Sequence, residues 1–340
     1  MQSNNNSRFC QEIEVSGHII DSMVLPRILD ALMDVGAEFS INELRVGRGK
    51  TDPSYSRIEI IASSPEMLER ALASVQMFGA VPVHTDDVAC QPAPADGVFP
   101  EGFYSTTNLE TQIRWRGDWL SVAHPEMDCG IVVEDGHAFC VPLSDVKKGQ
   151  MVVVGRKGVK LVPLERSRAP SSIFHFMGSE VSSEKPRALI IKETAARLKE
   201  VKSQGGRVLV VAGPALVHVG ARKDLSRLIL GGYVDYLFAG NGLATHDIES
   251  ALFGTSLGVP INGGPVPESG HEHHLRTINR IRALGGIRNA VEAGVLREGI
   301  MYSCIKAGVD YVLAGSIRDD GPLPDTVTDV LRAQTLMRDK

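Results

Sequence analysis

One stretch of the chain, residues 207–249, constrains the fold more than any other. It begins with an apolar run at 208–211, which has the length of a strand buried on both faces of a sheet. A segment with helical spacing follows and ends at paired glycines, and a second apolar run comes next at 234–239. The order strand, helix, strand predicts a βαβ unit, in which the two strands lie parallel.

The turn after the second run has the sequence Gly240-Asn241-Gly242. Ligands of open α/β sheets bind at the carboxyl ends of strands, and N–H groups at a helix start can receive a phosphate or a cofactor amide. The alternative interpretation is that these glycines only allow a tight turn. A third apolar run, 310–314, leads into two aspartates, and the second of them, Asp320, could accept hydrogen bonds from a ribose. The ordinary Rossmann fingerprint, Gly-x-Gly-x-x-Gly after a strand, is absent.

Two further segments precede this region. Residues 8–88 show the order β-α-β-β-α-β, which is typical of a ferredoxin-like α+β unit. Residues 86–97 are rich in Pro, Ala and Asp, and we interpret them as a linker. Residues 98–165 contain short apolar runs separated by turn residues, which predicts a small antiparallel sheet or barrel. We therefore expect an α/β protein whose third domain, 166–340, is a parallel Rossmann-like sheet with helices on both faces.

A polar stretch in the second segment does not look like a simple turn. Glu126, Asp128 and Cys129 place two carboxylates and a thiol within four residues. Such carboxylates could act as a general base or bind a substrate ammonium group. The alternative interpretation is a polar turn that carries a buried, inert cysteine.

Composition excludes several classes of protein. The 340 residues are 43% hydrophobic with a net charge of −5, and no concentrated basic face indicates nucleic-acid binding. No run approaches the roughly 18 apolar residues of a membrane span. Five scattered cysteines without a Cys-x-x-Cys pair fit a reducing cytoplasm. His271, His273 and His274 invite a metal interpretation, but they lack ligand spacing on a regular element, so no metal site is assigned.

Several motifs together resemble the archaeal-type, NAD-dependent ornithine cyclodeaminase family. They are GVFPEGFYSTTNLETQIR, HPEMDCGIVV, VVAGPALVH, YLFAGNGLATHDIE and VLAGSIRDDGPLPD. The N-terminal region is similar to the domain named after the lysine-ketoglutarate reductase/saccharopine dehydrogenase bifunctional enzyme. The chain is also similar to the C-terminal module of cyanobacterial arginine dihydrolase/ornithine cyclodeaminase proteins.

The resemblance implies conversion of L-ornithine into L-proline and ammonia by an internal NAD hydride cycle. It implies that Asn241, Gly242 and Asp320 contact NAD, and the family usually has Ala where this chain has Gly242. Family members also continue beyond Lys340 with further NAD contacts, so we expect the third domain to be incomplete. Because the resemblance does not name the base, Glu126, Asp128 and Cys129 are our hypothesis for the substrate amines.

Two alternatives stay open from the sequence. One is another NAD-dependent amine oxidation or transfer, because the third domain resembles the deoxyhypusine synthase type of NAD fold. The other is a non-catalytic protein that binds ligands. We expect a homo-oligomer, although the residues do not fix its state.

Overall fold

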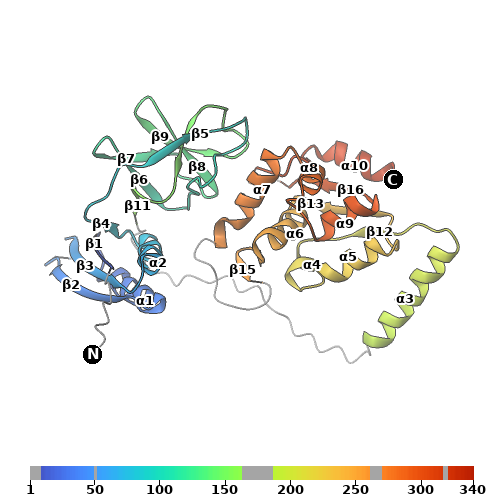
Figure 1. The fold of residues 1–340 in the computed structure, drawn as a ribbon, viewed down its shortest axis with the longest axis horizontal. Coiled ribbons are helices and arrows are strands. Elements are labelled where there is room, and N and C mark those ends of the chain that lie inside the picture. The colour runs from blue at the N-terminus through green and yellow to red at the C-terminus, as the bar shows by residue number, and fades with distance from the viewer. Residues whose placement is uncertain (1–8, 50–51, 163–186, 261–269, 317–320) are drawn as a thin grey trace, which may run out of the picture. The chain divides into compact units, whose positions relative to one another are not determined.

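The computed structural model describes residues 9–49, 52–162, 187–260, 270–316 and 321–340. The chain divides into two compact units, Met1–Ala169 and Pro170–Lys340. Each unit is described by itself (Figure 1). In the described part of the chain, no helix is both long and apolar enough to cross a membrane.

The first sheet of the N-terminal unit has the predicted order β-α-β-β-α-β. Its elements are β1 (Phe9–Gly17), α1 (Val24–Val35), β2 (Glu38–Arg45), β3 (Ser54–Ala62), α2 (Pro65–Gln76) and β4 (Val81–Pro82). The strands pair antiparallel in the order β2-β3-β1-β4, as in ferredoxin-like units. Ser64 caps α2 as its position before Pro65 predicts, because its side chain accepts a hydrogen bond from the N–H of Met67.

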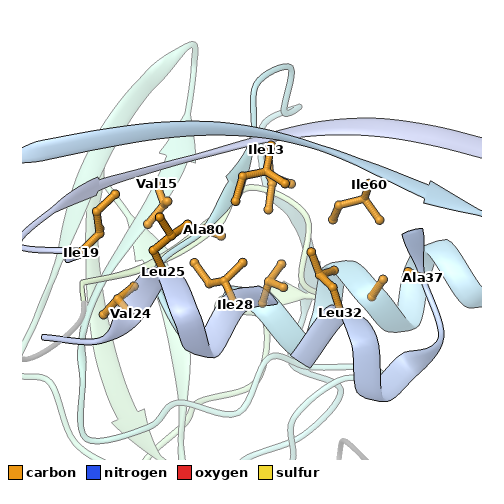
Figure 2. Packing of buried hydrophobic residues seen from close by; sticks show 13 residues of the cluster. Ile13, Val15, Ile19, Val24, Leu25, Ile28, Leu32, Ala37, Ile60 and Ala80 are labelled. Carbon is orange, nitrogen blue, oxygen red and sulfur yellow. The ribbon is translucent and has the colours of Figure 1, made fainter. Parts of the chain in front are cut away.

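The core of this sheet follows from two periodicities. Every second residue of β3 is buried, as the period of a strand requires when one face is covered. The buried side chains of α1, Ile28 and Leu32 among them, recur at helical spacing and pack against Ile13 and Ile60 of the strands. Figure 2 shows these side chains filling the layer between α1 and the sheet.

The second sheet of the N-terminal unit corrects two expectations. Its strands are β5 (Ala89–Pro92), β6 (Glu110–Trp115), β7 (Asp118–Ala123), β8 (Cys129–Glu134), β9 (His137–Pro142), β10 (Met151–Val154) and β11 (Val159–Val162), in the order β11-β6-β7-β9-β8-β10-β5. The expected linker 86–97 contains β5, which pairs with β10 at the edge of the sheet. Because β5 is an edge strand, three of its four residues are exposed, and it has no apolar run from which a strand could be predicted. The pair β7–β9 is parallel, so the sheet is mixed rather than antiparallel.

The C-terminal unit is built on a parallel sheet. Its elements are α3 (Arg187–Ser203), β12 (Leu209–Val211), α4 (Ala215–His218), α5 (Arg222–Leu230), β13 (Tyr236–Gly240), α6 (Asn241–Phe253), β14 (Thr255–Ser256), β15 (Val259–Pro260), η1 (Gly270–Glu272), α7 (His273–Ala283), α8 (Ile287–Glu292), α9 (Ile300–Ala307), β16 (Asp310–Ala314), β17 (Thr326–Val327) and α10 (Val330–Arg338). The order is β12-β13-β16-β17, with every pair parallel, which confirms the predicted βαβ unit.

One expectation about this sheet is wrong. The run at 208–211 was expected to be buried on both faces, yet Leu209 is 46% exposed and Val211 is 75% exposed. The physical reason is position, since β12 is an edge strand of the described sheet and few neighbouring elements cover its two faces there. Apolar runs predict a strand, but they do not distinguish an edge strand from a central one.

Helix α6 is deeply buried in this unit, and it carries residues of the candidate site. Its residues 243–250 are buried without interruption, so the helix has no solvent-facing side over two turns. A helix of this kind is expected to be apolar, but α6 contains several charged and polar side chains. Buried polar groups require hydrogen-bond partners, and α6 therefore fixes the elements that supply them.

Asp247 is the fully buried carboxylate of α6. It accepts hydrogen bonds from the Arg222 side chain of α5 at 2.7 Å and from the N–H groups of Ile300 at 2.9 Å and Met301 at 2.8 Å. The last two N–H groups open α9, so Asp247 caps that helix from a distant part of the chain. Burial raises the pKa of the Asp247 carboxyl, while Arg222 and the two N–H groups oppose that shift.

We predict that Asp247→Asn lowers the free energy of unfolding by about 3–5 kcal/mol, because the substitution leaves the buried Arg222 guanidinium with only the exposed Glu298 as a counter-charge. Denaturant unfolding followed by circular dichroism measures the change. The control is Glu298→Gln, which removes the other carboxylate on Arg222, at 2.9 Å, from a side chain that is 62% exposed. An exposed ion pair contributes up to about 1 kcal/mol, so equal losses in the two variants would contradict this account of Asp247.

Candidate functional site

The carboxyl ends of β12, β13 and β16 lie on one edge of the parallel sheet, as predicted for the turn at 240–242. Asn241 is the first residue of α6 and follows β13 directly. Its side-chain oxygen accepts hydrogen bonds from the N–H of Leu323 at 3.0 Å and from the hydroxyl of Thr326 at 3.1 Å. Asn241 therefore ties the segment after β16 to the start of α6. Since both lone pairs of that oxygen are in use, any contact from Asn241 to a cofactor uses other atoms.

The start of α6 has the properties of an anion site. Gly240 precedes the helix in an extended conformation and has no side chain with which to cap it. The first N–H groups of such a helix point outward and favour negative charge. A Cβ added to Gly242 would meet only Pro214, at 3.8 Å, so this position has room beside it and would also accept the alanine that the resemblance gives as usual. These features fit the pyrophosphate of NAD. Asp320 lies outside the described residues.

Glu249 forms the centre of a hydrogen-bonded cluster on α6. Its carboxylate accepts from the hydroxyl of Thr255 at 2.8 Å and from the N–H groups of Gly258 at 2.9 Å and Leu257 at 3.1 Å. It also contacts Nδ1 of His246 at 3.0 Å. Burial alone would raise the pKa of the Glu249 carboxyl, but the bonds from His246, Gly258 and Thr255 outweigh burial, so the pKa is lowered. The result is an ionised carboxylate that fastens β14 and β15 to α6.

Two imidazoles lie side by side next to Glu249. The rings of His246 and His218 have centroids 5.2 Å apart, and Nδ1 of His218 lies 2.8 Å from the hydroxyl of Ser256. Partial desolvation of its ring lowers the pKa of His218, the neighbouring His246 lowers it further, and Glu249 opposes them. His218 is exposed, whereas the side chain of His246 is only 11% exposed. The cluster therefore joins a buried carboxylate, a buried imidazole and an imidazole that reaches solvent.

A third histidine, His273 of α7, completes the cluster on its buried side. Its Nδ1 lies 2.8 Å from the Thr255 hydroxyl, and its ring stacks on Phe253 at 4.6 Å. Because the Thr255 hydroxyl donates its proton to Glu249, Nδ1 of His273 is the donor to that hydroxyl. Among the residues that the structure describes, no group of three His, Cys, Asp or Glu side chains could hold a metal ion.

Sequence reasoning missed this cluster. It considered the histidines at 271–274 for a metal and did not single out His218 or His246. The available signal was the spacing of His246 and Glu249, since residues three apart on a predicted helix face each other. His218 gave no such signal, because it reaches His246 through the packing of α4 on α6.

The predicted substrate residues lie together in the N-terminal unit, in the turn before β8. Glu126 is exposed, whereas Asp128 is 8% exposed and has a positive φ of 62°. Cys129 is the first residue of β8 and is buried, and its N–H donates to the Thr106 hydroxyl at 3.0 Å. The Thr106 hydroxyl in turn contacts the backbone oxygen of Glu126. The segment around Thr106 therefore fixes the shape of the turn on which all three residues sit.

Comparisons with known proteins agree with both units. Residues 10–109 match the LOR/SDH bifunctional enzyme conserved region. Residues 110–191 match the first C-terminal region of arginine dihydrolase ArgZ-like proteins, and residues 192–340 match their C-terminal Rossmann fold. These family models together extend over almost the whole chain.

Named relatives and a solved structure identify the family more closely. An ornithine cyclodeaminase from Methanopyrus kandleri is 52% identical, over 96% of this chain and 79% of that protein. One from Methanothermobacter thermautotrophicus is also 52% identical, over 96% of this chain and 80% of that protein. A crystal structure of the ternary complex of AgrE with ornithine and NAD+ is 37% identical with a TM-score of 0.80, and it covers 98% of this chain and 47% of AgrE. The chain thus spans about half of AgrE and most of its archaeal relatives, and it belongs to the ornithine cyclodeaminase family.

Proposed function

We propose that the chain converts L-ornithine into L-proline and ammonia, with NAD as an internal hydride carrier. The observation that supports this most is the identity of 52% to an archaeal ornithine cyclodeaminase over 96% of the chain. The start of α6 at the carboxyl edge of the parallel sheet supports NAD binding there. NAD, when bound, supplies an acceptor for the hydride at Cα of ornithine and returns that hydride later in the same cycle.

The chain's own residues have separate tasks toward the cofactor. The first N–H groups of α6 would bind the pyrophosphate, and Gly242, which has no side chain, leaves room for it. Asn241 would hold the segment 321–327 in place through Leu323 and Thr326. Asp320 is proposed to accept hydrogen bonds from ribose hydroxyls.

The proposed task of the turn before β8 is to bind the amines of the substrate. A carboxylate in a buried position attracts an ammonium group more strongly than one in water, so Asp128 is the stronger candidate and Glu126 the weaker one. Cys129 has its backbone fixed to Thr106 and would act by keeping Asp128 in position.

The remaining proposals concern the setting of the enzyme. A role in proline biosynthesis follows from the proposed product. All five cysteines are free thiols, which supports the reducing cytoplasm as the compartment. A homo-oligomer stays a prediction.

Isotope labels test the proposed reaction. Ornithine with deuterium at Cα is expected to give proline that keeps the deuterium at Cα, with NAD present in catalytic amount and no accumulation of NADH. Ornithine labelled with ¹⁵N at the α-amine is expected to release the label as ammonia, because the δ-amine forms the ring. Mass spectrometry reads both results. Deuterium lost to water, or ¹⁵N kept in proline, would rule out this internal cycle, and an aminoalkyl product would indicate a transferase.

Asp320→Ala tests the cofactor site. A lost hydrogen bond to a charged group costs roughly 1.5–3 kcal/mol, so the variant should bind NAD about ten- to hundredfold more weakly by calorimetry. Asp310→Ala is the matched control, because Asp310 begins β16 at the opposite end of the same strand and pairs with Lys340. Equal NAD affinity in the two variants would remove Asp320 from the site.

Asp128→Asn tests the substrate turn. Asparagine keeps the left-handed backbone conformation but removes the charge, so KM for ornithine should rise about tenfold or more while NAD affinity stays the same. Asp135→Asn is the control, since Asp135 also has a positive φ, at 48°, but is exposed between β8 and β9. Unchanged KM in Asp128→Asn would end the assignment.

A further inference from the structure

The histidine pair lies beside the proposed cofactor site within the same unit. Helices α4 and α6 follow the neighbouring parallel strands β12 and β13 at the same edge of the sheet. Pro214, directly before α4, lies next to Gly242. His246 is five residues beyond Asn241, a rise of about 7.5 Å along the helix. Both imidazoles are therefore within about two turns of the residues proposed for NAD.

The cluster has the construction of an acid–base group rather than of a packing contact. A carboxylate only accepts hydrogen bonds, so Nδ1 of His246 carries the proton toward Glu249 and Nε2 is the nitrogen left to exchange one. A carboxylate that fixes the tautomer and direction of an imidazole is the arrangement found where a histidine moves protons. His273, stacked on Phe253 and bound to Thr255, is the contrasting structural histidine of the same cluster.

The proton balance of the reaction requires a group that first accepts a proton and later donates it. Ornithine enters with two ammonium groups and one carboxylate, and zwitterionic proline with an ammonium ion leaves with the same net charge. A base must first remove a proton from the α-ammonium, because only a nitrogen with a free electron pair supports loss of the hydride from Cα. The imidazole that accepts this proton becomes imidazolium, and it later returns the proton to the released ammonia, forming ammonium. The δ-ammonium must also lose a proton before its nitrogen attacks the imine, and an equivalent proton is taken up when the nitrogen of proline becomes charged, so the overall charge balances.

We propose that His218 is the acid–base residue of this reaction and that His246 and Glu249 are its positioning residues. His218 is the exposed member of the cluster, and its Nδ1 is directed by Ser256, so Nε2 is the nitrogen that can meet a substrate. The inference rests on the proposed function and adds the proton carrier to it.

The groups around His218 determine the direction in which its pKa is shifted. Among the residues that the structure describes, the groups that face it are His246 and Glu249 of α6 and Ser256 of β14, and His273 of α7 reaches Glu249 through Thr255. Because partial desolvation and His246 lower the pKa of His218 below its ordinary 6.5, the ring is neutral at pH 7 and can accept a proton. Activity that depends on the neutral ring falls as the pH drops through this lowered pKa.

The experiment compares the wild-type protein with His218→Gln and His246→Gln, using kcat/KM for ornithine from pH 5 to 8 and NAD affinity. Removal of a general base costs on the order of 10²–10⁴-fold, so His218→Gln is expected to lose about that factor in kcat, to lose the acid limb of the profile and to keep its NAD affinity. Added imidazole should restore part of the rate. In His246→Gln the acid limb should move to higher pH, because the neighbour that lowers the pKa of His218 is gone.

Controls separate the possible failures. His137→Gln, at the exposed first residue of β9, should leave the profile unchanged. Circular dichroism checks folding. If His218→Gln does not fold, the shift of the acid limb in His246→Gln is the result that tests the role of His218. A wild type that forms no proline overturns the proposed function and this inference with it. An active wild type whose His218→Gln variant keeps its rate and acid limb, or an unmoved limb in His246→Gln, overturns only the role of His218.

Discussion

The buried charge of Asp247 is the interaction on which the C-terminal unit depends. It holds the Arg222 guanidinium of α5 and the opening N–H groups of α9, so three helices meet at one carboxylate. Gly299 shows how close the approach is, because a Cβ there would lie 2.6 Å from an oxygen of Asp247. Burial is the main cause that raises the pKa of the Cys304 thiol to about 12, and the charge of Asp247 adds to it. This cysteine therefore stays protonated and unreactive.

Helix α6 combines these structural contacts with the proposed chemistry on one short segment. Its first residue, Asn241, binds the segment after β16, Asp247 binds α5 and α9, and Glu249 binds the hairpin β14–β15. His246 directly precedes Asp247 in the same helix, and its ring lies next to that of His218 of α4. A rigid element with locked side chains is what a proton-transferring group needs, because small errors in position are costly to the rate. The burial of α6 and the proposed catalytic function thus have the same physical basis.

The sequence predicted most of the fold, because periodicity reports directly on burial. The ferredoxin-like order, the six short strands between 112 and 162 and the parallel pairs all follow from apolar spacing and turn residues. The prediction from sequence failed where burial depends on a strand's position in its sheet, as at the edge strands β5 and β12. It placed Asn241 and Gly242 at the carboxyl edge of the parallel sheet, where the structure has them, since topology determines where strands end; their contact with NAD stays a prediction. It could not find His218, because contact between α4 and α6 is a tertiary event with no local pattern.

The four hydrogen bonds to Glu249 link acid stability to the ordering of the hairpin. A carboxyl group whose pKa is lowered by folding stabilises the native state above its unfolded pKa of about 4.5, and this stabilisation disappears as the pH falls through the folded value. Protonation would cost the N–H groups of Leu257 and Gly258 their acceptor while it also frees the ring of His246. Acidification would therefore loosen β14–β15 by local unfolding before the sheet itself melts, with faster amide exchange at those two residues as its first sign.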